Sequence, residues 1–205
     1  YAENYYVPVK KATVPEIPQD GIFNIIFAGN IGVAQGLDVL IEAAKILKDQ
    51  KVRVRFNIVG NGRYKQTLIK KVEGDNLNKM FSFVSKQPAP RIPEFMAVCD
   101  AALICLSKSK AFSLTLPAKT QSCLACGIPI IVSADGEIQD LIHDARAGIC
   151  SNAGDAKGLA NNIQEIMNYP KDKLARMSTN AINCYNDNFD KDTLLNRMDV
   201  WFINN

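Results

Sequence analysis

The alternation of two kinds of segment constrains the fold of this chain more than any other feature. Short apolar runs rich in β-branched residues, such as FNIIFAG at residues 23–29 and VRFNIVG at residues 54–60, recur along it. Each is followed by a stretch with apolar residues at helical spacing. Runs that are apolar throughout fit strands buried on both faces. We therefore expect an α/β fold, a single doubly wound, Rossmann-like parallel sheet of about six strands with right-handed crossovers.

The same pattern predicts where the elements begin and end. The expected strands cover residues 23–29, 54–60, 81–85, 100–106, 128–133 and 147–150. The expected helices cover residues 36–49, 63–74, 92–99, 117–127, 137–145 and 155–169. Pro117 and Gly127 give one helix a proline start and a glycine stop. Gly74 is expected to cap the C-terminus of another helix, and Asp155 the N-terminus of a third.

The pattern divides the chain into three segments. Residues 1–20, rich in tyrosine, valine and proline and without a period, are expected to form an extended lead-in. Residues 21–170 would form the Rossmann-like domain, and residues 171–205 a helical C-terminal tail. We expect the tail to pack on the sheet, and apolar surface around Trp201 and Phe202 to favour dimers.

Composition narrows the class of protein. The 205 residues include 47% hydrophobic ones, which is enough for an ordinary globular core. The net charge of +3, without a basic run, argues against a nucleic-acid partner. No apolar run approaches the roughly 20 residues of a membrane span, and there is no signal-peptide pattern. Because the chain begins with Tyr1 rather than methionine, we expect a fragment or a processed product.

Six cysteines are present, and four of them fall within or beside apolar runs. That placement favours small buried thiols in a reducing compartment over a disulfide framework. Cys123 and Cys126 form a C-x-x-C pair, but a zinc site needs a second pair, and the only histidine is His143. We therefore expect core cysteines, no metal and no cofactor, with a redox pair as the alternative.

In a doubly wound sheet, ligands bind outside the carboxyl ends of the strands, where the strand order reverses. That rule selects the turns at residues 29–36, 60–63, 84–87, 106–119 and 133–137. The first turn holds Gly29, Gly32 and Gly36, which let the backbone approach a ligand. It lacks the pattern G-x-G-x-x-G, however, and carries no lysine or arginine.

Two of the other turns give weaker signals. Gly60 and Gly62 form a G-x-G after a strand, and Arg63 beside them faces either solvent or a ligand. Glu137 opens a helix, as an acidic residue should, and a substrate contact is its alternative role.

The turn SKSKAFSLTLPAK is the most informative of the five. It leads from Thr115 into a helix near Pro117, where the backbone N–H groups of Leu116 and Ala118 would meet a ligand. Lys119 would lie in the first turn of that helix, where a cation opposes the helix dipole. A bound diphosphate would remove that conflict, so we favour a ligand contact over a solvated lysine.

Together these pieces resemble the C-terminal domain of a GT-B glycosyltransferase of retaining family four, over residues 23–169. FAGNIGVAQGLDVLIEAAKIL and VRFNIVGNGRYKQTL are similar to its first two strands with their glycine turns. PAKTQSCLACGIPIIVSADGEIQDLI resembles its sugar-nucleotide segment, and AGICSNAGDAKGLANNI its closing strand, turn and helix. The resemblance implies two facing doubly wound domains. This one would bind a nucleoside diphosphate sugar without a metal, and an N-terminal domain outside this chain would bind the acceptor.

Four charged positions of that family are neutral in this chain. Many members carry arginine and lysine in the first turn, where this chain has Asn30 and Gln35. Many carry two glutamates where it has Leu114 and Ser122. We expect the positive charge to have moved to Lys119, in a P-A-K that resembles the P-S-K of a branch that makes bacterial surface polysaccharides.

The resemblance then implies roles for named residues. Lys119 and the backbone of residues 116–118 would hold the diphosphate, assisted by Asn30 and Gln35. The other expected substrate-binding residues are Ser122 near the ribose, the backbone of Val84 and Ser85 near the base, and Gly29, Gly60, Arg63, Thr115, Leu116, Ala118 and Glu137. No catalytic residue is assigned.

The leading hypothesis is a retaining, metal-independent hexosyltransferase of surface polysaccharide synthesis. It would move a sugar from a uridine diphosphate to a saccharide or lipid-linked acceptor, in the cytoplasm or at the cytoplasmic face of the membrane through peripheral association. This chain alone would be inactive or nearly so. The alternatives are a nucleotide-sugar-binding domain without transfer, a nucleotide-sugar epimerase, which usually relies on cleft carboxylates and histidines, and a dinucleotide dehydrogenase, which needs G-x-G-x-x-G.

Overall fold

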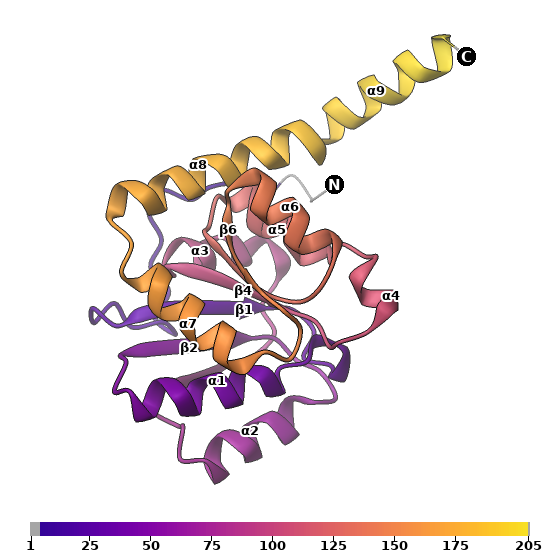
Figure 1. Ribbon diagram of the computed structural model, residues 1–205. Coiled ribbons are helices and arrows are strands. Elements are labelled where there is room, and N and C mark those ends of the chain that lie inside the picture. The colour runs from indigo at the N-terminus through magenta and orange to yellow at the C-terminus, as the bar shows by residue number, and fades with distance from the viewer. Residues whose placement is uncertain (1–4, 205) are drawn as a thin grey trace.

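The structure of the protein, a computed structural model, describes residues 5–204, except for the side chains of Trp201 and Asn204. Six parallel strands form one sheet in the order β3-β2-β1-β4-β5-β6 (Figure 1). They are β1 (Phe23–Ala28), β2 (Val54–Val59), β3 (Phe81–Val84), β4 (Ala101–Cys105), β5 (Ile130–Ser133) and β6 (Gly148–Ser151). The predicted doubly wound parallel sheet is confirmed.

Helices connect the strands and follow the last of them. They are α1 (Asp38–Asp49), α2 (Lys65–Gly74), α3 (Ile92–Ala97), α4 (Lys110–Ser113), α5 (Ala118–Cys126), α6 (Glu137–Ala145), α7 (Ala156–Met167), α8 (Lys171–Asn188) and α9 (Lys191–Asn204). Two short 3-10 helices, η1 (Val33–Gln35) and η2 (Ala89–Arg91), precede α1 and α3. Each helix predicted before the tail is present, whereas α4 forms inside a segment that we expected to be a polar loop.

Strand β1 lies at the centre of the sheet and pairs in parallel with β2 on one side and β4 on the other. The chain first builds the sheet outward from β1 through β2 to β3. It then crosses back and builds in the opposite direction through β4, β5 and β6. The order therefore reverses between β1 and β4, and a crevice is expected there, outside their carboxyl ends.

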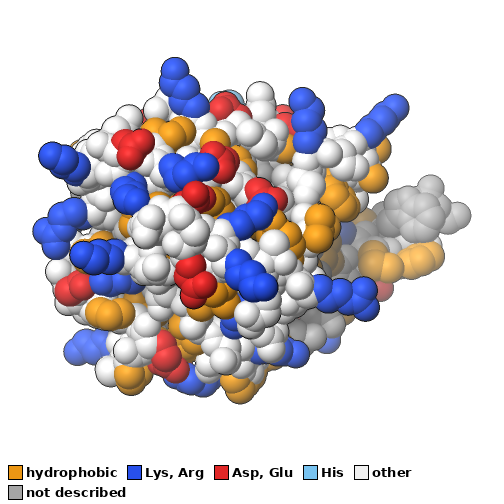
Figure 2. All heavy atoms as spheres, turned by 90° about the horizontal axis from the view of Figure 1, so that it is seen from below, with side chains coloured by type: hydrophobic (Ala, Val, Ile, Leu, Met, Phe, Trp, Pro, Cys, Tyr) orange, Lys and Arg blue, Asp and Glu red, His pale blue; other side chains and the backbone are white. Residues whose placement is uncertain are grey.

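The core consists of two layers, one on each face of the sheet. Ile25 and Phe27 of β1 pack into the layer that α1, α2 and α7 cover, whereas Ile26 packs into the layer under α3, α5 and α6 (Figure 1). This alternation follows from the period of two in a strand. On the face covered by α1 and α2, basic and acidic side chains are interspersed (Figure 2).

The helix ends follow the expected chemistry with two differences. Asp155 caps α7 by accepting from the Gly158 N–H, and Gly127 ends α5 in the left-handed conformation. The expected cap at Gly74 is wrong, because the helix continues through that residue. Asn76, with φ of 54°, takes the left-handed position, which asparagine tolerates. The first turn also enters η1 before α1, so α1 begins later than predicted.

The two ends of the chain attach differently to the sheet. In the lead-in, Val14 and Ile17 are buried in the layer that also holds α3 and α5. Helix α8 packs against α5, while α9 projects away from the body, with the Phe202 side chain 65% exposed (Figure 1). The side chain of Trp201 lies outside the described residues. Among the described helices, none combines the length and the apolar character needed to cross a membrane.

The contact between the turns after β1 and β2 yields a first prediction. Gly60 has φ of +151°, and a Cβ built there would lie 1.9 Å from the carbonyl oxygen of Gly29. We expect Gly60→Ala to lower the free energy of unfolding by about 3 kcal/mol and the melting temperature by about 6–12 °C. Differential scanning calorimetry on the whole chain measures both.

Gly74→Ala is the matched control, because nothing lies within 4 Å of a Cβ built at Gly74. Alanine favours a helix over glycine, so this change should leave the melting temperature equal or raise it. Equal melting temperatures for the two variants would contradict the steric argument.

Candidate functional site

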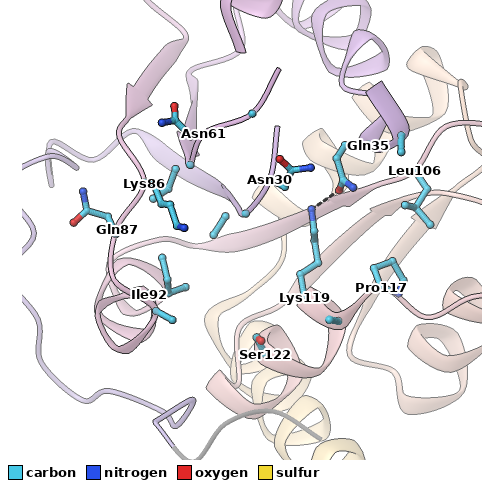
Figure 3. A pocket seen from close by; sticks show the side chains of 18 of the residues that line it. Asn30, Gln35, Asn61, Lys86, Gln87, Ile92, Leu106, Pro117, Lys119 and Ser122 are labelled. Carbon is cyan, nitrogen blue, oxygen red and sulfur yellow. Dashed lines mark hydrogen bonds between the residues drawn. The ribbon is translucent and has the colours of Figure 1, made fainter. Parts of the chain in front are cut away.

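A cavity of about 870 Å³ opens at the carboxyl edge of the sheet, around the point where the strand order reverses. Its walls come from the turns after β1 and β2, the loop after β3, the loop after β4 and the first turns of α5 (Figure 3). A volume of this size fits a ligand of nucleotide dimensions. The cavity is therefore the candidate functional site.

Lys119 is the cation at the centre of the cavity wall. It occupies the first turn of α5, and its side chain reaches back toward the turn after β1 (Figure 3). The Nζ atom donates a hydrogen bond to Oε1 of Gln35 and lies 3.8 Å from the centroid of the Phe27 ring. A Cβ built at Gly29 would lie 3.7 Å from Cε and Nζ of Lys119. The lysine thus occupies the space that a side chain at position 29 would otherwise approach.

The charge of Lys119 has little compensation from the protein. Burial lowers its pKa from 10.5 to about 8. The neighbouring thiols of Cys105 and Cys123 have pKa values raised by burial to about 12, so they are neutral near pH 7. Among the described residues, the ion pairs include none with Lys119. A partly buried ammonium group without a carboxylate partner is a suitable contact for an anionic ligand.

The start of α5 adds backbone donors to the same wall. Pro117 is the N-cap, so Ala118 and Lys119 are the first two helical residues, whose N–H groups have no partner within a helix. The Thr120 N–H is already used, because it donates to the Pro117 carbonyl at 2.8 Å. Two amides, the positive end of the helix dipole and the Lys119 ammonium therefore converge at one edge of the cavity.

The turns after β1 and β2 form the floor of the cavity and are tied together. The Ile31 N–H donates to the Asn61 carbonyl at 2.8 Å, and the Tyr64 N–H donates to the Ile31 carbonyl at 3.0 Å. A Cβ at Gly62 would lie 2.1 Å from the Ile31 carbonyl oxygen. The second glycine turn is therefore needed for packing of backbone against backbone, whether or not a ligand approaches it.

The structure brings most of the sequence-predicted site residues to the cavity. Those that line it are Gly29, Asn30, Gln35, Gly60, Thr115, Ala118, Lys119 and Ser122. Asn30 and Gln35 enter from the first turn, and Ser122 lies one turn of α5 below Lys119 (Figure 3). Helix α1 contributes no residue to the lining, because the chain first forms η1, capped by Gly36, and α1 begins only at Asp38.

Five predicted residues lie outside the cavity lining, namely Arg63, Val84, Ser85, Leu116 and Glu137. The carbonyl of Val84 is already satisfied, since it accepts from the Gly60 N–H at 3.1 Å and from Nζ of Lys65 at 3.3 Å. Arg63 and Glu137 are exposed, Glu137 in the first turn of α6. Leu116 precedes the N-cap of α5, so its amide lies before the helix.

Other lining residues were not selected from the sequence. Lys86 and Gln87 enter from the loop after β3, on the side of the cavity away from Lys119, next to Ile92 of α3 (Figure 3). The sequence selects the same turn but predicts the contacts at Val84 and Ser85, two residues earlier. Tyr6 enters from the lead-in, where no periodic signal exists. Burial raises the pKa of its phenol, and a hydrogen bond with Ser122 offsets part of that rise.

The cysteines are free thiols, three of them buried and three partly buried. Burial raises the pKa of both Cys123 and Cys126 to about 12, so neither is a ready nucleophile near neutral pH. Within residues 5–204, no group of three or more potential ligand side chains is placed to hold a metal ion.

Known proteins provide an independent comparison with this geometry. Residues 14–183 match the family described as "Glycosyl transferases group 1". A putative colanic acid biosynthesis glycosyl transferase of Escherichia coli strain K12, WcaI, is 30% identical over 150 residues, which are 72% of this chain and 36% of that protein. The chain thus spans about two fifths or less of the length of the curated relatives it matches.

Solved structures share the fold at lower identity. Sucrose-phosphate synthase from Thermosynechococcus elongatus superposes with a TM-score of 0.81 at 19% identity, over 98% of this chain and 49% of that one. HepE from Anabaena, in complex with UDP and glucose, gives 0.73 at 21%, over 88% of this chain and 48% of that one. The sheet and its helices are those of one half of a GT-B glycosyltransferase. Since the family match covers most of the sequence, this chain belongs to the glycosyl transferases group 1 family.

Proposed function

We propose that this domain binds the donor of a retaining, metal-independent hexosyltransferase, and that the donor is a uridine diphosphate sugar. The observation that supports it most is the Lys119 ammonium, which faces the cavity at the start of α5 and pairs with no carboxylate of the described residues. The diphosphate of the donor supplies the missing negative charge. A second domain, outside this chain, brings the acceptor.

In this proposal the diphosphate lies across the first turn of α5. The amides of Ala118 and Lys119 and the Lys119 ammonium point at its oxygens, and Asn30 and Gln35 donate neutral hydrogen bonds from the opposite turn. When the sugar leaves, negative charge develops on the diphosphate. Donors that are already in place then stabilise the leaving group, which is the role that a metal ion plays in other transferases.

The nucleoside is proposed to extend away from Lys119 toward the loop after β3. Ile92 and Met96 give that end of the cavity an apolar wall, and Lys86 and Gln87 give it hydrogen-bonding side chains. A lysine only donates hydrogen bonds. It therefore suits the carbonyl oxygens of uracil and disfavours the amino group of cytosine. That HepE, a neighbour in fold, was solved with UDP supports the same choice of nucleotide.

The proposed process is synthesis of a surface polysaccharide, with a saccharide or lipid-linked acceptor. Support comes from WcaI, which is named for colanic acid biosynthesis, and from the P-A-K of Pro117 to Lys119. We place the donor domain at residues 21–170, the lead-in at 1–20 and the tail at 171–205. We also place the parent protein in the cytoplasm, with peripheral association at the membrane.

A domain that binds the nucleotide sugar without transferring it is the second candidate, favoured by the neutral Asn30, Gln35, Leu114 and Ser122.

The role of Lys119 is tested by its removal. We expect Lys119→Met to weaken UDP binding by about ten- to hundredfold, because a charge-assisted hydrogen bond is lost, and Lys119→Arg to retain most of the affinity. Isothermal titration calorimetry without added metal measures each dissociation constant. Lys110→Met, an exposed lysine on α4, is the control. Equal affinity for wild type and Lys119→Met would refute the proposed contact.

The lowered pKa of Lys119 also predicts a pH dependence. The terminal phosphate is fully ionised above about pH 7.5, so its charge stays constant while Lys119 loses its proton. Because its pKa is about 8 without ligand, UDP binding takes up a proton above that pH. The affinity should be about tenfold lower at about pH 9 than at about pH 7. Lys119→Arg should bind with the same affinity at both, since the guanidinium stays charged. A flat wild-type profile would count against the assignment.

The same pKa has the opposite consequence for stability without nucleotide. The unfolded chain keeps the lysine proton up to a pKa of 10.5, whereas the folded chain keeps it only up to about 8. The unfolded state binds more protons between these values. The contribution of Lys119 to the free energy of unfolding therefore rises as the pH increases from about 8 to 10.5.

The uridine assignment is tested through Lys86. We expect wild type to prefer UDP over CDP, and Lys86→Met to lose about tenfold of that preference, because the donor to the uracil carbonyl is gone. Competition between the two nucleotides, read by calorimetry, gives the ratio directly. Lys110→Met should keep the wild-type ratio. Equal binding of UDP and CDP by the wild type would reject the proposed role of Lys86.

A further inference from the structure

The ring beneath Lys119 belongs to Phe27, the penultimate residue of β1, which is 1% exposed. Its face meets the ammonium group, with Nζ 3.8 Å from the ring centroid. We propose that Phe27 is a positioning residue of this site, and that the face of its ring holds the Lys119 ammonium at the carboxyl end of β1 without neutralising it.

The other described groups that face Lys119 are neutral near pH 7, so none of them holds the ammonium by its charge. From the first turn, Gln35 offers a neutral carbonyl oxygen. From β4 and α5, the thiols of Cys105 and Cys123 are protonated near neutral pH, because burial raises both pKa values to about 12. No carboxylate among the described residues pairs with the lysine. The negative face of an aromatic ring attracts a cation more strongly when the ring is desolvated, and Phe27 is 1% exposed.

An aromatic ring and a carboxylate differ in how many N–H groups of the lysine they leave available to a phosphate. A carboxylate would bind the same N–H groups that a phosphate needs and would repel the phosphate. A ring attracts the charge through its quadrupole without accepting a conventional hydrogen bond from the N–H groups. Lys119 is therefore held in place while its remaining N–H groups stay directed at the cavity.

Phe27 is also a core residue, packed in the layer under α1 and α7. A loss of stability on its replacement therefore says nothing about Lys119. The charge of Lys119 is the informative quantity, since a purely structural phenylalanine would leave it unchanged.

The test measures the Lys119 pKa in the whole chain by NMR, from the pH dependence of its Cε and Nζ resonances, assigned with Lys119→Arg. We expect Phe27→Leu to lower that pKa by about one unit from its wild-type value near 8, because the ammonium loses the ring. Phe27→Met carries the same expectation and serves if Phe27→Leu does not fold. A pKa that stays the same or rises in the folded variant overturns the proposal.

Phe56→Leu is the matched control for packing. Phe56 of β2 is equally buried, lies in the same core layer and pairs with the ring of Phe81 rather than with a cation. The variant should lose a comparable amount of stability and leave the Lys119 pKa unchanged. A pKa that falls equally in Phe56→Leu would show a general effect of loosened packing and would also overturn the proposal.

The inference about Phe27 rests on the proposed function only in taking the anion to be the donor diphosphate. Different results would refute the role of Phe27 and the donor proposal. In Phe27→Leu, the pH at which UDP affinity begins to fall should move down by about one unit. In the double variant with Lys119→Arg, affinity should no longer depend on pH. Absence of UDP binding by the wild type would refute the donor proposal, while the NMR titration still decides the role of Phe27.

Discussion

The site depends on backbone contacts that fix the turn after β1 from two sides. On one side, Gly60 and Gly62 lie so close to the carbonyl oxygens of Gly29 and Ile31 that neither position has room for a Cβ. On the other, the Ser107 N–H and hydroxyl donate to carbonyl oxygens of the η1 segment at 2.9 and 2.8 Å. The turn is thereby fixed between the loops that follow β2 and β4. Contacts between main-chain atoms therefore fix the floor of the cavity. We expect substitutions of side chains in the cavity to leave these contacts in place.

Lys119 breaks two local rules at once. A cation in the first turn of a helix opposes the helix dipole, and a partly buried ammonium without a carboxylate loses hydration without an equivalent return. The lowered pKa expresses that cost. Local rules are often broken at functional sites. Lysines also stand in the first turns of α2, α7 and α8, so the burial that lowers its pKa, rather than its place in the helix, distinguishes Lys119. That burial supports the proposed contact of Lys119 with an anion.

Elements with a local periodic signal could be predicted from the sequence, and α6 has the predicted bounds. Contacts across the sheet could not. The rule that ligands bind outside the carboxyl ends of strands selects the turn after β3 but not the residues within it. The Val84 carbonyl accepts from the Gly60 N–H and from Lys65, and the residues of this turn that line the cavity are Lys86 and Gln87. Tyr6 comes from a lead-in without any period. Phe27 reads as a core residue, and only the fold places a lysine 3.8 Å from its ring.

The neutral first turn and the buried lysine form one arrangement. Gln35 uses its carbonyl oxygen to accept from Lys119, which leaves its amide N–H groups free for an anion. The ring of Phe27 attracts the same ammonium from below. A first turn with its own arginine would remain charged at any pH and would need no such support. Here the charge comes from α5, on a lysine that reaches the first turn and whose protonation depends on its neighbours. In the proposed function, the strength of donor binding is then set by the groups that hold Lys119 as well as by those that touch the donor.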